Sequence, residues 1–296
     1  MGAVKKAVLF VNLRKENSKE TSQKIQDELE KRNIKTDIFY FDGKQREKHP
    51  FTAKFPSQGE WDVAFSLGGD GTVLYTARCL APLGVPILPV NLGSLCFIAG
   101  VSRDTWLTVF NLWEKGEISL SRRCMLEIAV ERQSKIVMKN ICLNDAVISS
   151  TGIARLVRLD VISSPEGTGL GSYRCDGLII ATTTGSTAYS MAAGGPIMDP
   201  EMEAVIINPI CPFTLSNRPL VLPSRQALAV TVAQEQRTDV LLTVDGQDSF
   251  ALECSDRIII QHAPWPALLI FEDRLSYYSA LRTKLSLSGG GGGFDA

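Results

Sequence analysis

The sequence predicts two domains of different class: an α/β domain with a parallel sheet, followed by a domain rich in β-strands. Strand and helix patterns alternate up to about residue 116, and beyond it apolar residues recur at every second position with few helix signals. A length of 296 residues fits roughly two domains of about 150 residues each. We therefore expect an α/β domain over 1–116 and a β-rich domain over 117–266.

In the first domain, short apolar runs predict strands, at 7–11, 38–41, 62–67 and 85–90. Asn17 and Glu20 have the spacing of a capping box and predict the start of a helix. Asp104 is expected to cap a further helix that runs through Trp113 and is closed by Gly116. This β-α-β alternation is typical of a parallel sheet with helices on its faces.

In the second domain, period-two alternation predicts strands at 125–130, 136–138, 146–149, 156–162, 178–181, 227–232, 240–244 and 257–260. The one helix expected there covers 187–193, and 167–171 is expected to be a hairpin turn rather than a dinucleotide-binding loop. Residues 267–288 predict a strand and a helix that return to the first domain. The glycine-rich end, 289–296, predicts a flexible tail.

The composition is that of an ordinary globular protein. A net charge of -1 gives no long-range attraction to nucleic acid, and no apolar run reaches the roughly 18 residues of a membrane span, so neither partner is expected. Seven scattered cysteines without Cys-x-x-Cys spacing predict free thiols and a cytoplasmic location. With two histidines in the chain, acid–base chemistry is expected to fall to carboxylates.

The turn Gly68-Gly69-Asp70-Gly71-Thr72 follows a predicted strand and precedes a predicted helix over 73–80. The glycines uncover backbone amides and permit positive φ, and Thr72 is expected to cap the helix, so amides and helix dipole would face an anion. A carboxylate there suits a metal ligand or a base that accepts a proton from an attacking hydroxyl. The turn therefore predicts phosphoryl transfer, although an ordinary tight turn has the same composition.

A second strand exit, over 174–190, leads into a loop rich in hydroxyls and glycine. Such a loop can bind ribose and phosphate oxygens. The Tyr189 ring offers a flat face on which a base could stack, and the Asp176 carboxylate can accept a hydrogen bond from a sugar hydroxyl. The alternative is structural, with the hydroxyls as a helix cap and Tyr189 in the core. Asn144-Asp145 likewise suits ribose hydroxyls or an Asx-turn, and 244–247 has the pattern of a hairpin turn.

Together these motifs resemble the NAD kinase family. The resemblance covers most of the chain from about residue 60, and its quoted segments are 68–71, 91–97, 143–145, 176–190, 194–197, 212–219 and 245–247. The block around Gly185-Ser186-Thr187-Ala188-Tyr189 is highly specific, whereas Gly-Gly-Asp-Gly is shared with diacylglycerol and sphingosine kinases. The resemblance implies an α/β nucleotide-type domain followed by a β-rich domain that binds NAD, and assembly into a homodimer or homotetramer.

The resemblance also assigns roles. Asp70 would take the proton from the adenosine ribose 2′-hydroxyl, beside Gly71, while Gly68, Gly69, Gly71 and Thr72 form the phosphate-donor loop. The remaining NAD-binding residues implied in this way are Phe97, Asn144, Asp145, Arg155, Arg174, Asp176, Thr187, Ala188, Tyr189, Ser190, Asp245 and Gln247. Of these, Arg174 and Asp176 would approach the nicotinamide half from the same or a neighbouring subunit.

Three positions depart from the family pattern. Asp145 replaces a more usual Glu, Cys96 a more usual Gly, and Thr183 a more usual Pro. The shorter Asp145 side chain leaves room for a water that bridges its carboxylate and the ribose.

We therefore expect phosphorylation of the 2′-hydroxyl of NAD⁺ by ATP or polyphosphate. The reaction would use Mg²⁺ or another divalent cation, carried mainly by the donor phosphates. Two alternatives remain at this stage: a lipid kinase that shares the glycine turn, and a dinucleotide sensor without turnover.

Overall fold

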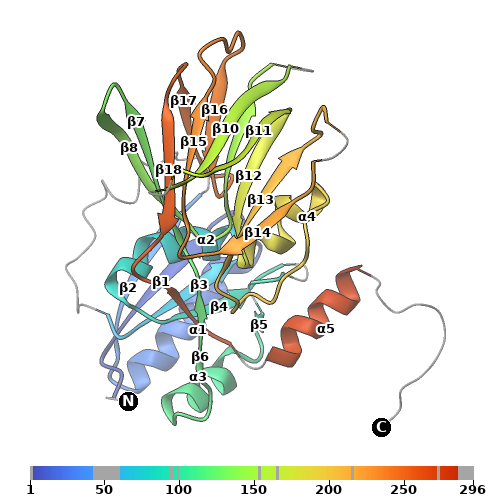
Figure 1. Ribbon diagram of the computed structural model, residues 1–296. Coiled ribbons are helices and arrows are strands. Elements are labelled where there is room, and N and C mark those ends of the chain that lie inside the picture. Colours follow the sequence, from blue (N-terminus) through green and yellow to red (C-terminus); the bar gives the residue numbers. More distant parts are fainter. Residues whose placement is uncertain are drawn as a thin grey trace, which may run out of the picture. The chain divides into compact units, whose positions relative to one another are not determined.

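The computed structural model describes residues 3–42, 61–93, 96–98, 100–152, 155–164, 167–214, 217–271 and 274–285 (Figure 1). These residues divide into two compact units, 3–42 with 61–121 and 268–285 in the first, and 122–267 in the second. The first is an α/β unit and the second is built of strands, so the predicted fold class is confirmed. Of the helices in these ranges, none combines the length and apolar character that crossing a bilayer requires.

The first unit contains a seven-stranded sheet with the order β2-β1-β3-β4-β19-β6, and β5 pairs with β4. Its strands are β1 (Lys6–Asn12), β2 (Lys35–Phe41), β3 (Val63–Gly68), β4 (Ile87–Asn91), β5 (Val101–Ser102), β6 (Leu120–Arg123) and β19 (Ala267–Ile270). The central strands pair in parallel, with Val11 opposite Leu67 and Leu67 opposite Val90. The carboxyl ends of β1, β3 and β4 therefore lie at one edge of the sheet.

Helices accompany this sheet: α1 (Ser18–Lys31), α2 (Asp70–Leu80), the short 3₁₀ helix η1 (Ala81–Leu83), α3 (Trp106–Glu114) and α5 (Arg274–Leu285). All six residues of β3 are buried, as expected for a parallel strand covered on both faces. Leu9, Phe65 and Val90 pack with Ile25 of α1 and Phe110 of α3 in one apolar core.

The helix starts differ from the sequence predictions. Asn17 precedes α1 but has a left-handed backbone with φ 60° and makes no side-chain cap, so the capping box is wrong. The N-cap of α2 is Gly69, and Thr72 lies inside the helix, so the predicted Thr72 cap is also wrong. Before α3, the hydroxyl of Ser102, not the Asp104 carboxylate, accepts the amides of residues 104 and 105, both at 3.2 Å.

The second unit contains two six-stranded antiparallel sheets, with the orders β11-β10-β15-β18-β7-β8 and β14-β13-β12-β9-β16-β17. The strands of the first are β7 (Leu126–Arg132), β8 (Lys135–Cys142), β10 (Val157–Ser164), β11 (Gly169–Cys175), β15 (Ala227–Val232) and β18 (Arg257–His262). Those of the second are β9 (Asp145–Ser150), β12 (Gly177–Thr182), β13 (Ala204–Ile210), β14 (Leu220–Pro223), β16 (Val240–Val244) and β17 (Asp248–Leu252).

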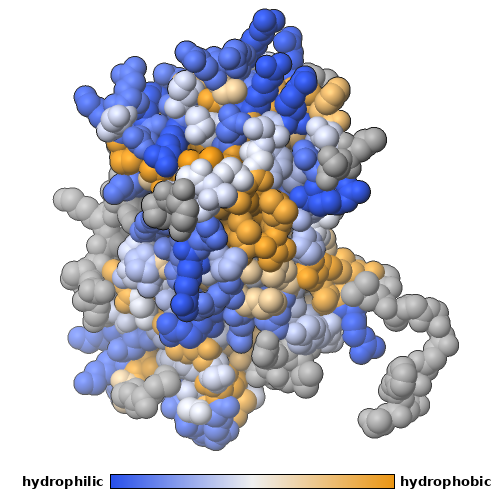
Figure 2. Space-filling model, viewed as in Figure 1, coloured by the Kyte–Doolittle hydropathy of each residue, from blue (hydrophilic) through white to orange (hydrophobic). Residues whose placement is uncertain are grey.

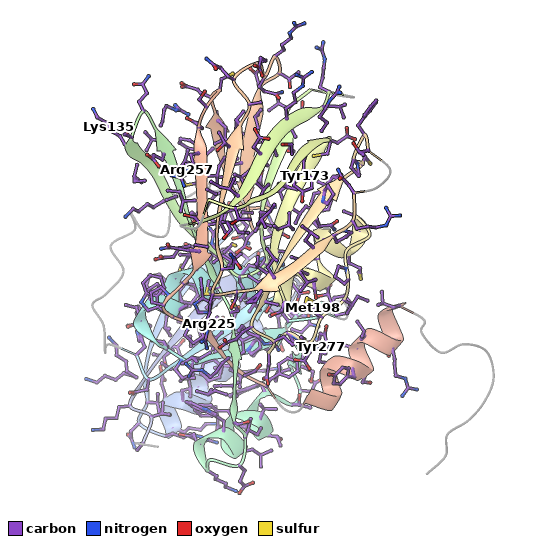
Figure 3. The ribbon with its side chains drawn as sticks, viewed as in Figure 1. Lys135, Tyr173, Met198, Arg225, Arg257 and Tyr277 are labelled. Atoms are coloured by element: carbon purple, nitrogen blue, oxygen red, sulfur yellow. The ribbon has the colours of Figure 1, made fainter. Side chains whose placement is uncertain are left out.

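Apolar side chains from both sheets form one shared core, which includes Ile128, Leu159, Ile180 and Leu242. Tyr173 of β11 belongs to this core, whereas Lys135 in the β7–β8 hairpin points outward (Figure 3). Polar residues cover much of the visible outer end of these strands (Figure 2). In these strands, the apolar residues of the predicted period-two pattern therefore face the core, and the alternating polar residues face solvent.

The central strand β12 is buried on both faces because a smaller cluster covers its second face, with Ile179, Met198 and Ile206 among its members. The chain leaves β12 through a 3₁₀ turn, η2 (Thr184–Thr187), and a four-residue helix, α4 (Tyr189–Ala192). The predicted continuous helix over 187–193 is therefore wrong in form. The predicted hairpin turn at 244–247 is confirmed, since it joins the paired antiparallel strands β16 and β17. The predicted turn at 167–171 is only partly right, because β11 already begins at Gly169 and pairs with β10.

Candidate active site

In the first unit, the glycine turn lies where β3 ends and α2 begins. Gly69 is extended, with φ -117° and ψ -168°, and none of the turn glycines has positive φ, so that expectation is wrong. The turn needs glycine for space instead. A Cβ at Gly68 would lie 2.0 Å from the Thr72 hydroxyl oxygen, which in turn accepts a 3.3 Å hydrogen bond from the Asn12 side chain.

Asp70 is the first residue of α2, and its carboxylate accepts two backbone amides. The amide of Phe97 donates to one oxygen at 3.0 Å, and that of Ile98 to the other at 2.9 Å. The arrangement orients Asp70 and links it to the segment that carries Phe97, which the sequence also placed in the site.

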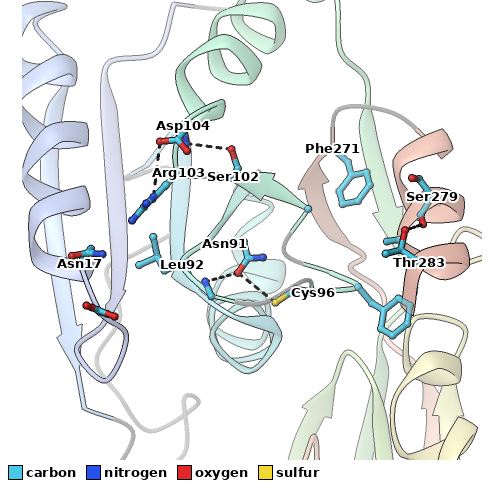
Figure 4. Close-up of a pocket in the computed structure, with 15 residues that line it drawn as sticks. Asn17, Asn91, Leu92, Cys96, Ser102, Arg103, Asp104, Phe271, Ser279 and Thr283 are labelled. Atoms are coloured by element: carbon cyan, nitrogen blue, oxygen red, sulfur yellow. Dashed lines mark hydrogen bonds and ion pairs between the residues drawn. The ribbon is translucent and has the colours of Figure 1, made fainter. Parts of the chain in front are cut away.

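A cavity of about 700 Å³ lies in the same unit (Figure 4). Asn91, Cys96 and Phe97 line it near the glycine turn. Phe271, directly after β19, and Thr283 of α5 line it as well. The Asn91 side chain accepts the amide of Gly93 at 2.9 Å and the Cys96 thiol at 3.5 Å. The volume of this cavity is within the range of small-molecule sites, about 300–1,000 Å³.

In the second unit, Asn144 and Asp145 lie where β8 turns into β9, and Asp245 holds this turn from the β16–β17 hairpin. One Asp245 oxygen accepts the amide of Leu143 at 3.0 Å, and the other accepts those of Asn144 and Asp145 at 2.8 and 3.1 Å. Asp245 is 7% exposed. It therefore fixes the backbone of the Asn-Asp pair, and Gln247 lies in the same hairpin turn.

The Asp145 side chain is 5% exposed and lies near a second carboxylate. Burial raises the pKa of the Asp145 carboxyl to about 7, and the charge of Asp245 adds to this effect. A carboxyl with this pKa changes charge around neutral pH. The side-chain oxygen of Asn144 is buried without a hydrogen-bond partner in the described residues, as is the hydroxyl of Thr184, and a buried polar atom of this kind suits a bound ligand.

The exit of β12 packs directly on the Asn-Asp turn. The amide of Thr182 donates to the Asn144 carbonyl at 2.8 Å, and the Thr182 hydroxyl donates to the carbonyl of Leu143 and accepts the amide of Gly185. A Cβ at Gly185 would lie 2.2 Å from the Asn144 carbonyl oxygen. Thr182 and Gly185 therefore fix the register of the two turns, although neither was predicted as a site residue.

The block from Thr187 to Ser190 has one exposed ring. Tyr189 is 48% exposed, so the alternative that placed it in the core is excluded, while Thr187 is 8% exposed and Ala188 is half-buried. Ser190 is fully buried, and its carbonyl and hydroxyl accept the Asn208 side chain at 2.9 and 3.2 Å. The geometry therefore favours a positioning role for Ser190 rather than ligand contact.

Asp176 directly precedes β12, at the other end of that strand from the Asn-Asp turn, and Arg174 is near the end of β11. Asp145 is opposite Ala181 in the sheet, whereas Gly177, next to Asp176, is opposite Ser149. Five strand residues span about 17 Å. Within one chain these residues therefore do not meet the Asn-Asp turn. Arg174 lies 4.9 Å from the centre of the Phe213 ring, and Arg155 shares a cavity of about 490 Å³ with Arg174.

The positions that depart from the family pattern have local explanations. Thr183 has φ -64°, which proline could also adopt, and its hydroxyl lies within hydrogen-bonding distance of the carbonyls of Pro200 and Met202, at 3.1 and 3.0 Å. The Cys96 sulfur would lie 3.7 Å from a Cβ at Gly69, so this side chain lies against the glycine turn. All seven cysteines are free, as the sequence predicts.

Two family models match the chain. The ATP-NAD kinase N-terminal domain matches residues 2–118, and the ATP-NAD kinase C-terminal domain matches 143–271. The chain belongs to the NAD kinase family. The NAD kinase of Treponema denticola is 39% identical over 97% of this chain and 98% of that protein, and the NAD kinase of Geobacter sulfurreducens is 40% identical over 76% and 78%.

Two solved structures of the family share the fold. Yeast NADH kinase complexed with NADH superposes with a TM-score of 0.81 at 22% identity, over 97% of this chain and 89% of that one. The NAD kinase from Archaeoglobus fulgidus in complex with ATP gives 0.70 at 23% identity, over 94% and 99%. At these identities the likeness supports the architecture, and the roles of individual residues depend on the geometry above.

Proposed function

We propose that this NAD kinase family member transfers the terminal phosphoryl group of ATP to the adenosine ribose 2′-hydroxyl of NAD⁺. The hydroxyl oxygen attacks the γ-phosphorus, the bond to the β–γ bridging oxygen breaks, ADP leaves, and Asp70 takes the hydroxyl proton. The observation that carries the proposal is the placement of Asp70 at the exit of β3, oriented by the amides of Phe97 and Ile98.

The donor is assigned to the first unit. The glycine turn and the amino end of α2 suit phosphate oxygens, and the adjacent cavity of about 700 Å³ has room for a nucleotide. The groups of three or more His, Cys, Asp or Glu side chains that a metal site needs are absent from the described ranges. The divalent cation would be carried mainly by the donor phosphates, where it would neutralise charge during transfer.

The acceptor is assigned to the second unit. Asn144 and Asp145 would bind the ribose and Tyr189 the base, with Thr187, Ala188 and Gln247 alongside. Asp245 and Ser190 would position these groups. Because Asp176 lies about 17 Å from the Asn-Asp turn along β12, and Arg174 is two residues before it in β11, we propose that they, with Arg155, serve the NAD⁺ of a neighbouring copy in a homodimer or homotetramer. Polyphosphate as a second donor and the cytoplasmic location remain predictions.

The test is product formation from defined substrates. The purified protein is incubated with Mg-ATP and NAD⁺, and NADP⁺ is detected with an NADP-specific dehydrogenase, which does not accept the 3′-phosphate isomer. Parallel reactions contain polyphosphate in place of ATP, or a diacylglycerol in place of NAD⁺. The proposal predicts NADP⁺ with ATP and no lipid phosphorylation, and NAD⁺ binding without any NADP⁺ would contradict it.

A further inference from the structure

Lys15 follows β1 and lies beside the glycine turn. Its backbone amide donates to the Asn12 carbonyl at 3.1 Å, which places it in the tight turn between β1 and α1. The side chain of Asn12 also bonds Thr72 in the first turn of α2. The end of β1 is therefore linked to the segment that carries Asp70, although Lys15 is far from it in sequence.

The ammonium group of Lys15 lies between two glycine-containing turns. It would be 3.9 Å from a Cβ at Gly69, after β3, and 3.2 Å from a Cβ at Gly93, after β4. Both turns are at the carboxyl edge of the parallel sheet, which is where ligands of such sheets bind. The next residue along the chain, Glu16, lines the cavity that also contains Gly93 and Cys96.

The ammonium group of Lys15 lies close to the amino end of α2. Within the described ranges, no carboxylate forms an ion pair with it, and the nearby Asp70 carboxylate accepts the amides of Phe97 and Ile98. A helix N-terminus carries partial positive charge, so a cation beside the first turn of α2 is at the unfavourable end of the helix. A bound anion between them would turn this repulsion into attraction.

We propose that Lys15 binds the phosphate chain of the donor, with its ammonium group on oxygens of the transferred or the adjacent phosphoryl group. The inference rests on the proposed function and adds a donor contact outside the glycine turn. A flexible ammonium can follow phosphate oxygens as charge moves from the transferred group to the leaving group. Asp70 would then act on the acceptor hydroxyl and Lys15 on the donor.

The test compares Lys15→Gln with Arg14→Gln. Arg14 is the adjacent, more exposed cation, and it is not among the nearest atoms at Gly69 or Gly93. Loss of one charge-assisted contact predicts a fall in kcat/KM for Mg-ATP of about 10- to 100-fold in Lys15→Gln, with KM for NAD⁺ within twofold of wild type. Arg14→Gln is expected to match wild type, and Lys15→Arg to retain more activity than Lys15→Gln.

A binding measurement provides a second readout. Inorganic tripolyphosphate should compete with ATP in the wild-type enzyme, and its inhibition constant should rise in Lys15→Gln by the same factor as the loss in kcat/KM for Mg-ATP. Equal effects of the Lys15 and Arg14 substitutions, or an effect on KM for NAD⁺ alone, would overturn the role of Lys15. A wild-type protein that forms no NADP⁺ would instead contradict the proposed function, so the two failures are distinguishable.

Discussion

Replacement of Asp245 by Asn tests whether this residue acts by holding the Asn144-Asp145 turn. In the wild type, three backbone amides donate to the two carboxylate oxygens at 2.8–3.1 Å. An Asn side chain keeps one oxygen, and its NH₂ group must face at least one backbone N–H. Each hydrogen bond to a charged group contributes about 1.5–3 kcal/mol, and a buried donor left unsatisfied costs about 1–3 kcal/mol.

One opposing effect reduces this cost. Removal of the Asp245 charge makes ionisation of Asp145 easier, because that charge contributes to the raised pKa of Asp145. We expect a net loss of about 2 kcal/mol in the free energy of unfolding at pH 7. For an m-value of about 2–3 kcal/mol/M, the urea midpoint would fall by about 0.7–1 M. Far-UV circular dichroism follows the transition.

The kinetic consequence should be specific to the acceptor. The turn that shifts carries the proposed ribose contacts, so KM for NAD⁺ should rise about tenfold, roughly the loss of one 1.4 kcal/mol interaction, while KM for ATP stays within twofold. Asp248→Asn is the matched control, because its side chain is half-buried in the same hairpin and accepts the Asn140 side chain at 3.1 Å. If the two variants behave alike, or if KM for ATP changes instead, the reasoning is refuted.

Three further predictions concern the pH dependence of stability, the substitution of glycines in the turn after β3, and the reactivity of the thiols. The pKa of Asp145 is raised to about 7 from an unfolded value of 3.8, so the native state favours the protonated form and wild-type stability should fall as pH rises from about 4 to 7. The Asp145→Asn substitution removes this pH-dependent loss of stability, so the urea midpoint of the variant should exceed that of wild type by more at pH 8 than at pH 5. Urea midpoints that differ by the same amount at both pH values would contradict the prediction. Gly68→Ala should destabilise the protein by about 1–3 kcal/mol, because the new Cβ would lie 2.0 Å from the Thr72 hydroxyl oxygen. Gly69→Ala, whose Cβ would have its nearest contact at 3.7 Å, should cost less than about 0.5 kcal/mol. Thermal unfolding measures both. With Ellman's reagent, the exposed Cys211 and Cys254 should react first, and the buried Cys79, Cys124, Cys142 and Cys175 only after unfolding; fast reaction of a buried thiol in the native protein would contradict the core packing.

The fold class of each unit was predictable because the spacing of apolar residues along the sequence follows which residues are buried. Strand β3 reads as a continuous apolar run, and β7 alternates between core and solvent, as the structure shows. Strands β13 and β17 were not predicted. The first contains Pro209, which argues against a strand, and the second, Asp248–Leu252, begins with two polar residues and is held by its pairing with β16.

The candidate site was predictable in its motifs but not in its internal contacts. The sequence indicated Asp70 and Asn144-Asp145, but it did not indicate that the amides of Phe97 and Ile98 orient the first, or that Asp245 fixes the second. Contacts between residues about 27 to 102 positions apart depend on tertiary structure. The same holds for Lys15, whose neighbours at Gly69 and Gly93 come from other strands.

The central claim is that Asp70 is the base that accepts the proton of the ribose 2′-hydroxyl. The most direct measurement is kcat of the Asp70→Asn enzyme at saturating NAD⁺ and Mg-ATP. Asn keeps one oxygen for the amide of Phe97 or Ile98, so NAD⁺ binding should persist, with KM values within a few-fold of wild type. If Asp70 is the base, kcat should fall by about 10²- to 10⁴-fold. A variant that forms NADP⁺ within a few-fold of the wild-type rate would contradict it.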